Sequence, residues 1–303
     1  MKIFVTGSTG LVGSALVPFL TTAGHEVIRL VRSEPKGAKG EIFWDPYAET
    51  VDKKQLEGAD AVVHLAGENI ASRWTDKKKE KIRHSRVKTT RFLSKTLGGL
   101  ENPPEALVCP SAIGYYGDRN EELLKEDSKA GTGFLAEVCQ QWETATEPAV
   151  KKGIRVVNLR LGLVLSPEGG ALGKMLFPFK MGAGGLIGSG QQYWSWIAMD
   201  DVVGAIHHAI VTESLKGPVN AVAPNPVSNR EFTKTLGRVL SRPTLFPMPA
   251  FAARLAFGEM ADALLLASAR VEPAKLKDSG YEFRQPELEN ALRHLLGKKG
   301  VEV

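Results

Sequence analysis

The segment Gly7-Ser8-Thr9-Gly10-Leu11-Val12-Gly13 has the spacing of a phosphate-binding loop. Its glycines stand at the first, fourth and seventh positions, between an apolar run and a helical pattern. Glycine permits the tight turn, lets backbone N–H groups approach a pyrophosphate, and allows the helix to pack closely on the strand. The first helical turn then directs unpaired N–H groups at the anion. The loop therefore predicts a dinucleotide site formed by Gly7, Thr9, Gly10, Leu11, Val12 and Gly13.

The residues after the second apolar run favour one dinucleotide over another. Sites for NAD commonly place Asp or Glu here, to accept hydrogen bonds from the adenosine 2′-hydroxyl. This chain has Arg32 and Ser33 instead. A guanidinium offers no acceptor to a hydroxyl, but it suits a 2′-phosphate and stacks on adenine, and the serine adds a donor. We expect NADP(H) rather than NAD(H); the alternative is that Arg32 only ends an exposed strand.

These residues need a framework of alternating strands and helices to hold them. Near-continuous apolar strands that alternate with helices indicate an α/β fold with a Rossmann-like, doubly wound parallel sheet covered on both faces. Strands are predicted at 2–5, 26–32, 61–65, 106–109 and 155–159. Helices are predicted at 11–20, 77–97 and 134–150.

The chain changes character beyond Leu165, where glycine and proline become frequent and helical patterns shorter. We expect an NADP-binding Rossmann domain over 1–165, to which 200–223 returns as a helix and a strand. A smaller C-terminal α+β substrate lobe is expected over 166–303, with helices at 229–240, 250–257 and 287–296. Its glycine-rich segment 182–196 ends in amide and aromatic side chains. That segment could close over a sugar or another planar ligand between the lobes, or simply pack at their interface.

Several motifs carry a resemblance to a known group of proteins. The glycine loop, Asp60-Ala-Val-Val-His-Leu-Ala-Gly67 and Tyr115-Tyr116-Gly117 resemble the extended short-chain dehydrogenase/reductase superfamily. A narrower set is similar to an atypical, epimerase-like family of sugar-nucleotide epimerase type, whose members carry a small C-terminal domain of unknown function. That set comprises 65–70, Arg73-Trp74, Ser85-Arg86, 111–117, 134–137 with Trp142-Glu143, and 187–191. The likeness extends from Met1 to about Leu296.

The resemblance implies further cofactor contacts. Leu65 and Ala66 would line the adenosine ribose through their backbone, and Val164 would approach the nicotinamide end with its main chain. Arg86 would reach the phosphates or a ribose, with assistance from Lys81. The alternatives are plain strand packing for Leu65, Ala66 and Val164, and a surface ion pair for Arg86.

The resemblance also implies a catalytic pair that this chain lacks. Active members of the superfamily use Tyr-x-x-x-Lys on a helix, where the ammonium lets the phenol exchange a proton with the substrate during hydride transfer. Alignment on Trp142-Glu143 puts Leu135 and Cys139 at these positions. No Tyr-x-x-x-Lys occurs anywhere in the chain.

The Ser or Thr that accompanies the pair is missing too, because Ala112 stands in its place. The remaining candidates for proton transfer are Ser111, Tyr115 and Tyr116, and each of them could instead only shape the nicotinamide pocket. We expect Cys139 to be an inert, buried thiol, because no histidine neighbour is evident.

Composition limits the classes of protein further. The 303 residues are 43% hydrophobic and 24% charged, as in a folded globular chain. The two cysteines, Cys109 and Cys139, lie in no metal-binding or disulfide pattern, so no metal is expected. A net charge of +5 is too mild to indicate nucleic acid. No apolar run approaches the ~20 residues of a membrane span, and a first strand at Lys2 leaves no room for a leader, so we expect a cytoplasmic protein.

Two functions stay open on these grounds. The first is an atypical NADP(H)-dependent oxidoreductase or epimerase, whose proton step is uncatalysed or assisted by a small-molecule substrate such as a sugar or a carbonyl compound. The second is a catalytically silent NADP(H)-binding protein that senses cofactor state or binds a partner. Both share the cofactor site and differ at the nicotinamide end. Neither a nucleic-acid nor a membrane partner is expected, and no pattern indicates an oligomeric state.

Overall fold

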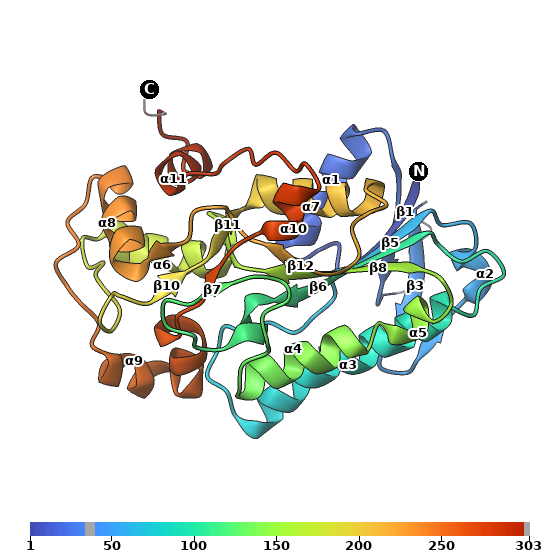
Figure 1. The fold of residues 1–303 in the computed structure, drawn as a ribbon, viewed down its shortest axis with the longest axis horizontal. Coiled ribbons are helices and arrows are strands. Elements are labelled where there is room, and N and C mark those ends of the chain that lie inside the picture. The colour runs from blue at the N-terminus through green and yellow to red at the C-terminus, as the bar shows by residue number, and fades with distance from the viewer. Residues whose placement is uncertain (34–39, 300–303) are drawn as a thin grey trace.

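An eight-stranded sheet forms the centre of the molecule, in the order β12-β8-β6-β5-β1-β2-β3-β4 (Figure 1). The computed structural model describes residues 1–33 and 40–299. All neighbouring strands are parallel except β3 and β4. The strands are β1 (Lys2–Thr6), β2 (Glu26–Val31), β3 (Glu41–Asp45), β4 (Thr50–Val51), β5 (Ala61–His64), β6 (Ala106–Ala112), β8 (Arg155–Leu161) and β12 (Gly217–Ala221).

Helices cover both faces of this sheet, as Figure 1 shows. α1 (Leu11–Thr22) and α7 (Met199–Val211) pack on one face. α3 (Asp76–Leu97) and α5 (Glu147–Val150) pack on the other, with α4 (Phe134–Thr144) lying against α3. The short helix α2 (Lys53–Leu56) lies near the β4 edge. The predicted doubly wound parallel sheet is therefore confirmed.

Strand β1 illustrates how the sequence builds the two faces. Ile3 and Val5 are fully buried in the cluster beneath α1 and α7, whereas Phe4 is fully buried in the cluster beneath α3 and α5. Successive side chains of a strand point to opposite faces, so a strand covered on both sides is apolar at every position. This explains why the apolar runs of the sequence are continuous rather than alternating.

One predicted helix is interrupted. The sequence predicts a helix over 134–150, but α4 ends at Thr144 and the separate turn α5 begins at Glu147. Pro148 explains the difference, because proline has no N–H for an intrahelical bond and its ring clashes with the carbonyl four residues earlier. Here that residue is Thr144, the last residue of α4.

The C-terminal lobe has its own apolar core. Trp196, Phe232 and Leu292 are buried there, between α6 (Gly170–Lys180), α8 (Asn229–Leu240) and α11 (Leu288–Leu295). The remaining helices are the turns η1 (Ile113–Tyr116) and η2 (Ala261–Leu266), α9 (Ala250–Phe257) and α10 (Ala274–Asp278). Short strand pairs complete the lobe: β7 (Leu123–Leu124) with β14 (Arg270–Val271), β9 (Leu163–Ser166) with β11 (Trp196–Ala198), and β10 (Tyr193–Trp194) with β13 (Val227–Ser228).

The chain crosses back to the large sheet within this lobe. After α6 and β11 it forms α7, which packs against α1, and then β12, which pairs in parallel with β8. Only afterwards does it build α8 to α11. The N-terminal sheet is therefore completed by residues 217–221.

Among residues 1–33 and 40–299, no helix is long and apolar enough to cross a membrane. In the same residues, no group of three or more His, Cys, Asp and Glu side chains is arranged to hold a metal ion. Both cysteines are buried and unbridged.

A buried histidine connects the ends of two central strands. His64, the last residue of β5, is fully buried, and its Nδ1 lies 2.7 Å from Oγ1 of Thr6 at the end of β1. Thr6 Oγ1 also accepts a hydrogen bond from the backbone N–H of Ala66 at 3.2 Å. Burial lowers the pKa of His64 to about 4, because the charged imidazolium cannot be solvated.

We predict that His64 makes the fold acid-sensitive. Since its pKa in the folded chain lies below the unfolded value of about 6.5, its contribution to stability is complete above that pH and is lost as the pH falls towards 4. From about pH 7.5 to about pH 5.5 the free energy of unfolding should fall by about 1 kcal/mol from this group. Denaturant titrations of the wild type and of His64→Asn measure it, and parallel pH dependences of the two would contradict it.

Candidate functional site

The glycine loop makes a turn that a side chain would block at two of its three glycines. Gly7 has φ +67°, and a Cβ built on it would lie 2.6 Å from the carbonyl carbon of Leu65. A Cβ on Gly13 would lie only 2.2 Å from the carbonyl oxygen of Gly7. At Gly10 the nearest atom would be 3.3 Å away, which is tight but not a collision. The first glycine is therefore required by the close approach of the backbone at Leu65, and the third by the packing of α1 on the loop.

The N-terminus of α1 is open towards the loop. Gly10 precedes the helix with φ −77° and ψ 173°, and no side chain caps the first turn. The N–H of Gly10 donates to Gly7 O at 3.0 Å, and the carbonyl of Gly10 accepts from Ser14 N at 2.8 Å. The N–H groups of the first helical turn have no partner within a helix, so those of Leu11, Val12 and Gly13 are available to an anion. Thr9 beside them is exposed.

Several predicted site residues gather around this turn. Leu65 follows β5 directly, and Ala66 comes next with its N–H held by Thr6. Val164 lies on β9, and Leu11, Leu65 and Val164 all pack at the margin of the same core cluster. The sheet thus brings together segments that lie far apart in the chain.

Arg32 and Ser33 follow the carboxyl end of β2, beside the end of β1 from which the glycine loop begins. β2 ends at Val31, and Leu30 pairs in register with Thr6, the residue before the loop. The side chains of Arg32 and Ser33 are both exposed. Among residues 1–33 and 40–299, none forms an ion pair or a side-chain hydrogen bond with Arg32.

Arg86 of α3 is held beside the strand ends. Its Nη1 donates to the carbonyl oxygens of Glu68 at 3.1 Å and Ile82 at 3.3 Å, and its Cζ lies 5.0 Å from the ring centre of Trp142. A Cβ on Gly67 would be 3.8 Å from Cζ. Burial lowers the pKa of Arg86. Nε and Nη2 have no protein acceptor in the described part of the chain, and they stay accessible to solvent because Arg86 is only half-buried.

Lys81 lies on another side of α3. Five residues before Arg86, it is exposed and lines a cavity of about 360 Å³ together with Tyr47, Glu68 and His84. The rings of Tyr47 and His84 stack there, with centres 5.2 Å apart. A helix turns 100° per residue, so Lys81 and Arg86 cannot share one face. Both cations nevertheless lie near Glu68, whose pKa is lowered first by its hydrogen bond with Lys78 and then by Lys81 and Arg86.

The three candidates for proton transfer surround Arg160. The hydroxyl of Tyr116 donates to Asn220 Oδ1 at 2.7 Å and accepts from Arg160 Nη1 at 2.9 Å. Burial raises the pKa of Tyr116 to about 12. The ring of Tyr115 lies over the guanidinium, with its centre 3.5 Å from Cζ. Ser111 Oγ donates to Glu143 Oε1 at 2.8 Å.

Arg160 and Glu143 form a buried ion pair that the sequence analysis missed. Nε donates to Oε1 at 2.8 Å and Nη2 to Oε2 at 2.9 Å, which is a bidentate pair. The signal available in the sequence was Arg160 between Leu159 and Leu161, directly after the predicted strand. Since the pair also binds Ser111 and Tyr116, it fixes the turn η1 and helix α4 against β8.

An apolar cluster packs against the turn η1, which carries Tyr115 and Tyr116. Leu135 packs against Gly114, where a Cβ would lie 3.3 Å from the leucine Cβ. It belongs to a cluster with Ile70, Trp74, Phe134, Met260 and Leu264, from both lobes.

Burial raises the pKa of Cys139, one helical turn further along α4 than Leu135, to about 11, so this thiol is neutral near pH 7.

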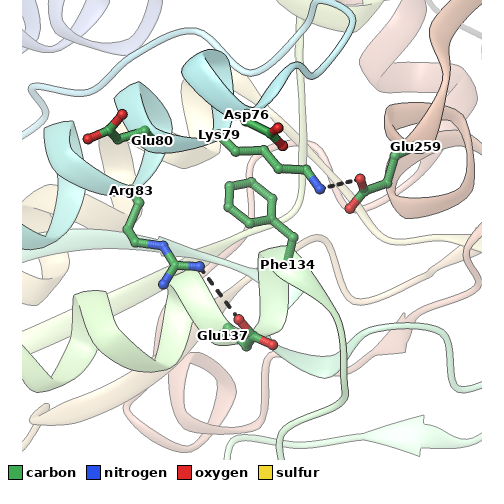
Figure 2. A pocket seen from close by; sticks show the side chains of 7 residues that line it. All are labelled: Asp76, Lys79, Glu80, Arg83, Phe134, Glu137 and Glu259. Carbon is green, nitrogen blue, oxygen red and sulfur yellow. Dashed lines mark ion pairs between the residues drawn. The ribbon is translucent and has the colours of Figure 1, made fainter.

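A second cavity, of about 490 Å³, opens beside this cluster (Figure 2). Lys79 and Glu259 form an ion pair on one side of Phe134, and Arg83 and Glu137 form another at 3.5 Å on the other side. The ring of Phe134 lies 5.3 Å from Lys79 Nζ. These two cations are already paired within the protein, and Glu259 brings the C-terminal lobe to α3.

The strand order, the glycine loop at the first crossover and the helices on both faces define a dinucleotide-binding, Rossmann-like α/β fold. Comparison with known proteins gives the family. Residues 3–221 match the NAD dependent epimerase/dehydratase family, and this chain belongs to it. Residues 248–295 match a domain of unknown function, DUF1731. The epimerase-like resemblance of the sequence is thereby confirmed.

Individual relatives match over nearly the whole chain. An epimerase family protein of Mycobacterium tuberculosis, MT2273, is 43% identical over 98% of this chain and 98% of its own length. The crystal structure of human epimerase family protein SDR39U1 (isoform 2) with NADPH has a TM-score of 0.89 and 34% identity, covering 98% of this chain and 99% of that one. A nucleoside-diphosphate sugar epimerase from Corynebacterium glutamicum has a TM-score of 0.83 and 42% identity, covering 99% of this chain and 59% of that one.

We predict opposite outcomes for two glycine substitutions in the loop. Gly13→Ala should displace α1 and cost roughly 1–3 kcal/mol of stability, because its Cβ would meet backbone that cannot move aside. Gly10→Ala, at an ordinary φ of −77°, is the matched control and should change stability by less than about 0.5 kcal/mol. Thermal or denaturant unfolding measures both, and equal stabilities of the two variants would contradict the packing argument.

Proposed function

We propose that this chain binds NADP(H) at the loop of residues 7–13 and is an oxidoreductase-like member of its family that lacks the tyrosine–lysine pair. The observation that carries the proposal is the fit of the loop to a diphosphate. A Cβ at Gly7 or Gly13 would collide with backbone, and the amides of the first turn of α1 remain open to an anion. When bound, NADPH supplies the hydride; binding and orienting it depend on the chain's own residues.

Around the diphosphate, backbone groups do most of the positioning. The N–H groups of Leu11, Val12 and Gly13 bind its oxygens. Leu65 and Ala66 pass the adenosine ribose with their backbone, and the bond between Ala66 N–H and Thr6 keeps that segment in place. The main chain at Val164 borders the nicotinamide end. Backbone contacts of this kind require close approach rather than particular side chains, which is consistent with the small residues of the loop.

Two arginines supply the charge for this cofactor. Arg32, with Ser33, accepts the 2′-phosphate, because a planar guanidinium pairs with phosphate through two parallel hydrogen bonds. Arg86 offers Nε and Nη2, which bond to no acceptor in the described residues, to a phosphate or a ribose hydroxyl. The likeness to a human protein crystallised with NADPH supports this choice of cofactor. Lys81 has a minor role at most, since it lies on a different side of α3.

A second function is favoured by the geometry at the nicotinamide end. The hydroxyl of Tyr116 is enclosed and fully bonded, Ser111 is held by Glu143, and Tyr115 covers Arg160. Leu135 and Cys139 supply no acid or base. These contacts support a catalytically silent NADP(H)-binding protein as the alternative to an enzyme whose substrate assists its own proton transfer.

We predict that NADPH binds more tightly than NADH and that Arg32 accounts for the difference. Arg32→Ala should weaken NADPH by about 10- to 100-fold, because a hydrogen bond to a charged group is worth about 1.5–3 kcal/mol, and should leave NADH nearly unchanged. Arg91→Ala is the matched control, because Arg91 is also an exposed arginine but lies on α3. Isothermal titration measures the six affinities of the three proteins for the two cofactors. Equal affinity of the wild type for the two cofactors would overturn the preference.

We predict that turnover separates the two functions. Protein and NADPH are mixed with a panel of aldehydes, ketones and nucleotide sugars, and the near-ultraviolet absorbance of NADPH and the mass of the products are followed. An enzyme consumes NADPH with at least one carbonyl compound, and Tyr116→Phe should retain that activity, because its hydroxyl is enclosed. Tight NADPH binding without turnover on any compound is the result expected of the silent protein.

A further inference from the structure

Two histidines face each other at the contact between α1 and α7. His25 lies in the turn between α1 and β2, and His207 lies on α7, 182 residues further along the chain. Their Nε2 atoms are 3.0 Å apart, and the ring centres are 5.2 Å apart. Two lone pairs repel each other at this distance, so a proton or a metal ion must lie between the two nitrogens.

The pair lies at the opposite end of the sheet from the glycine loop. His25 directly precedes β2, so it lies where the parallel strands β1 and β2 begin. The glycine loop follows the other end of β1. Whatever the two histidines bind is therefore separate from the proposed cofactor, and neither site depends on the other.

Both rings are carried by backbone that is already fixed. The N–H of His25 donates to the carbonyl oxygen of Leu20, in the last turn of α1, at 3.1 Å. α7 packs against α1 within the main apolar core, and the ring of His207 meets that of Phe19 edge to face, with centres 5.9 Å apart. Both nitrogens are therefore held in place before a ligand arrives, which reduces the entropy that binding would cost.

No other group of the described chain competes for these nitrogens. Among residues 1–33 and 40–299, neither ring has an ion pair or a further side-chain hydrogen bond. Burial, and then the charges of His25 and His208, lower the pKa of His207, so its ring is neutral near pH 7 and keeps a lone pair. The next residue, His208, is directed elsewhere, because its Nε2 lies 2.9 Å from Oγ of Ser279.

The separation of the two nitrogens suits a shared metal ion. Zinc binds imidazole nitrogen at about 2.0–2.1 Å. Two such ligands at an angle of about 90–109° around the ion would lie about 2.9–3.4 Å apart, and the observed 3.0 Å falls within this range. Both side chains are half-exposed, so a small rotation of each ring is enough to direct both lone pairs at one ion.

We propose that His25 and His207 bind one divalent transition-metal ion of the zinc, copper or nickel type. Imidazole suits these ions, whereas Mg²⁺ and Ca²⁺ prefer oxygen ligands. In the described residues no group of three or more His, Cys, Asp and Glu side chains surrounds the pair, so water completes the coordination from the exposed side. The bound ion joins the turn before β2 to α7, the helix that leads the chain back to the large sheet.

Titration of the intact chain tests the proposal. The protein is first freed of metal with a chelator and dialysed, and zinc chloride is then added. Isothermal titration should give one ion per chain, and magnesium chloride should give no binding heat. The chain has six histidines, and zinc should shift the ring signals of two of them in proton NMR spectra. With zinc about hundredfold above its dissociation constant, the unfolding temperature should rise by about 4 °C.

Variants locate the site. His25→Gln and His207→Gln should each weaken zinc binding at least about tenfold, because each removes one of the two protein ligands, while the amide can still bond to the remaining ring. His208→Gln is the matched control, since His208 lies on the same helix and is also half-buried, and this variant should bind zinc as the wild type does. The affinity for NADPH should be unchanged in all three variants.

Three outcomes would overturn the proposal. The first is a metal-free chain that binds no zinc, which would leave only a proton shared between the two rings. The second is a zinc affinity that both His25→Gln and His207→Gln retain, which would mark an adventitious ion at another histidine. The third is an equal loss of affinity in His208→Gln. NADPH binding is measured in the same samples, so failure of the cofactor proposal is seen separately.

Discussion

The contact between α1 and the loop before it determines the geometry of the whole N-terminal site. Gly13 lies so close to the carbonyl of Gly7 that no larger residue fits, and this closeness brings the start of the helix to the ends of the strands. α1 then packs against α7 and the central strands. The bond from Ala66 to Thr6 holds the neighbouring strand end at the same level. Packing between backbone atoms therefore specifies the shape of the loop.

Polar groups near the strand ends fall into two sets. At the ends of β6 and β8, Ser111, Tyr116, Glu143 and Arg160 satisfy one another, and none is left over for a reacting molecule. Arg86 is half-buried instead, and its Nε and Nη2 bond to no acceptor in the described residues. A completed network is stable by itself. The first set therefore supports the fold, whereas the second contains the donors proposed for the cofactor.

Much of this arrangement could be predicted from local patterns in the sequence. The glycine spacing predicted the first turn, continuous apolar runs predicted the covered sheet, and the limits of α8 and α9 agree with the predicted ranges. Patterns that depend on one residue were weaker: Pro148 was present in the sequence, yet the break it causes after Thr144 was not predicted. The positions of individual backbone atoms, such as Gly7 O, follow only from the packed structure.

Contacts between distant segments could not be predicted. Tyr116 bonds to Asn220 across 104 residues, and Arg73 bonds to Leu255 across 182. The spacing of apolar residues in one segment does not show which distant segment that one will contact. The same limit applies to charge: Lys174 and Arg254 would be taken for free cations from their residue type, and only the fold shows that each is already engaged.

The two lobes are interleaved along the chain, since β12 completes the large sheet only after α6 has begun the second lobe. A cut after residue 165 would remove the outermost parallel strand and the helix α7 from the sheet and expose the edge of β8. Neither half could then be exchanged as a module by joining genes at a single point. Shuffling of one lobe among relatives would require two crossovers, one on each side of the returning strand.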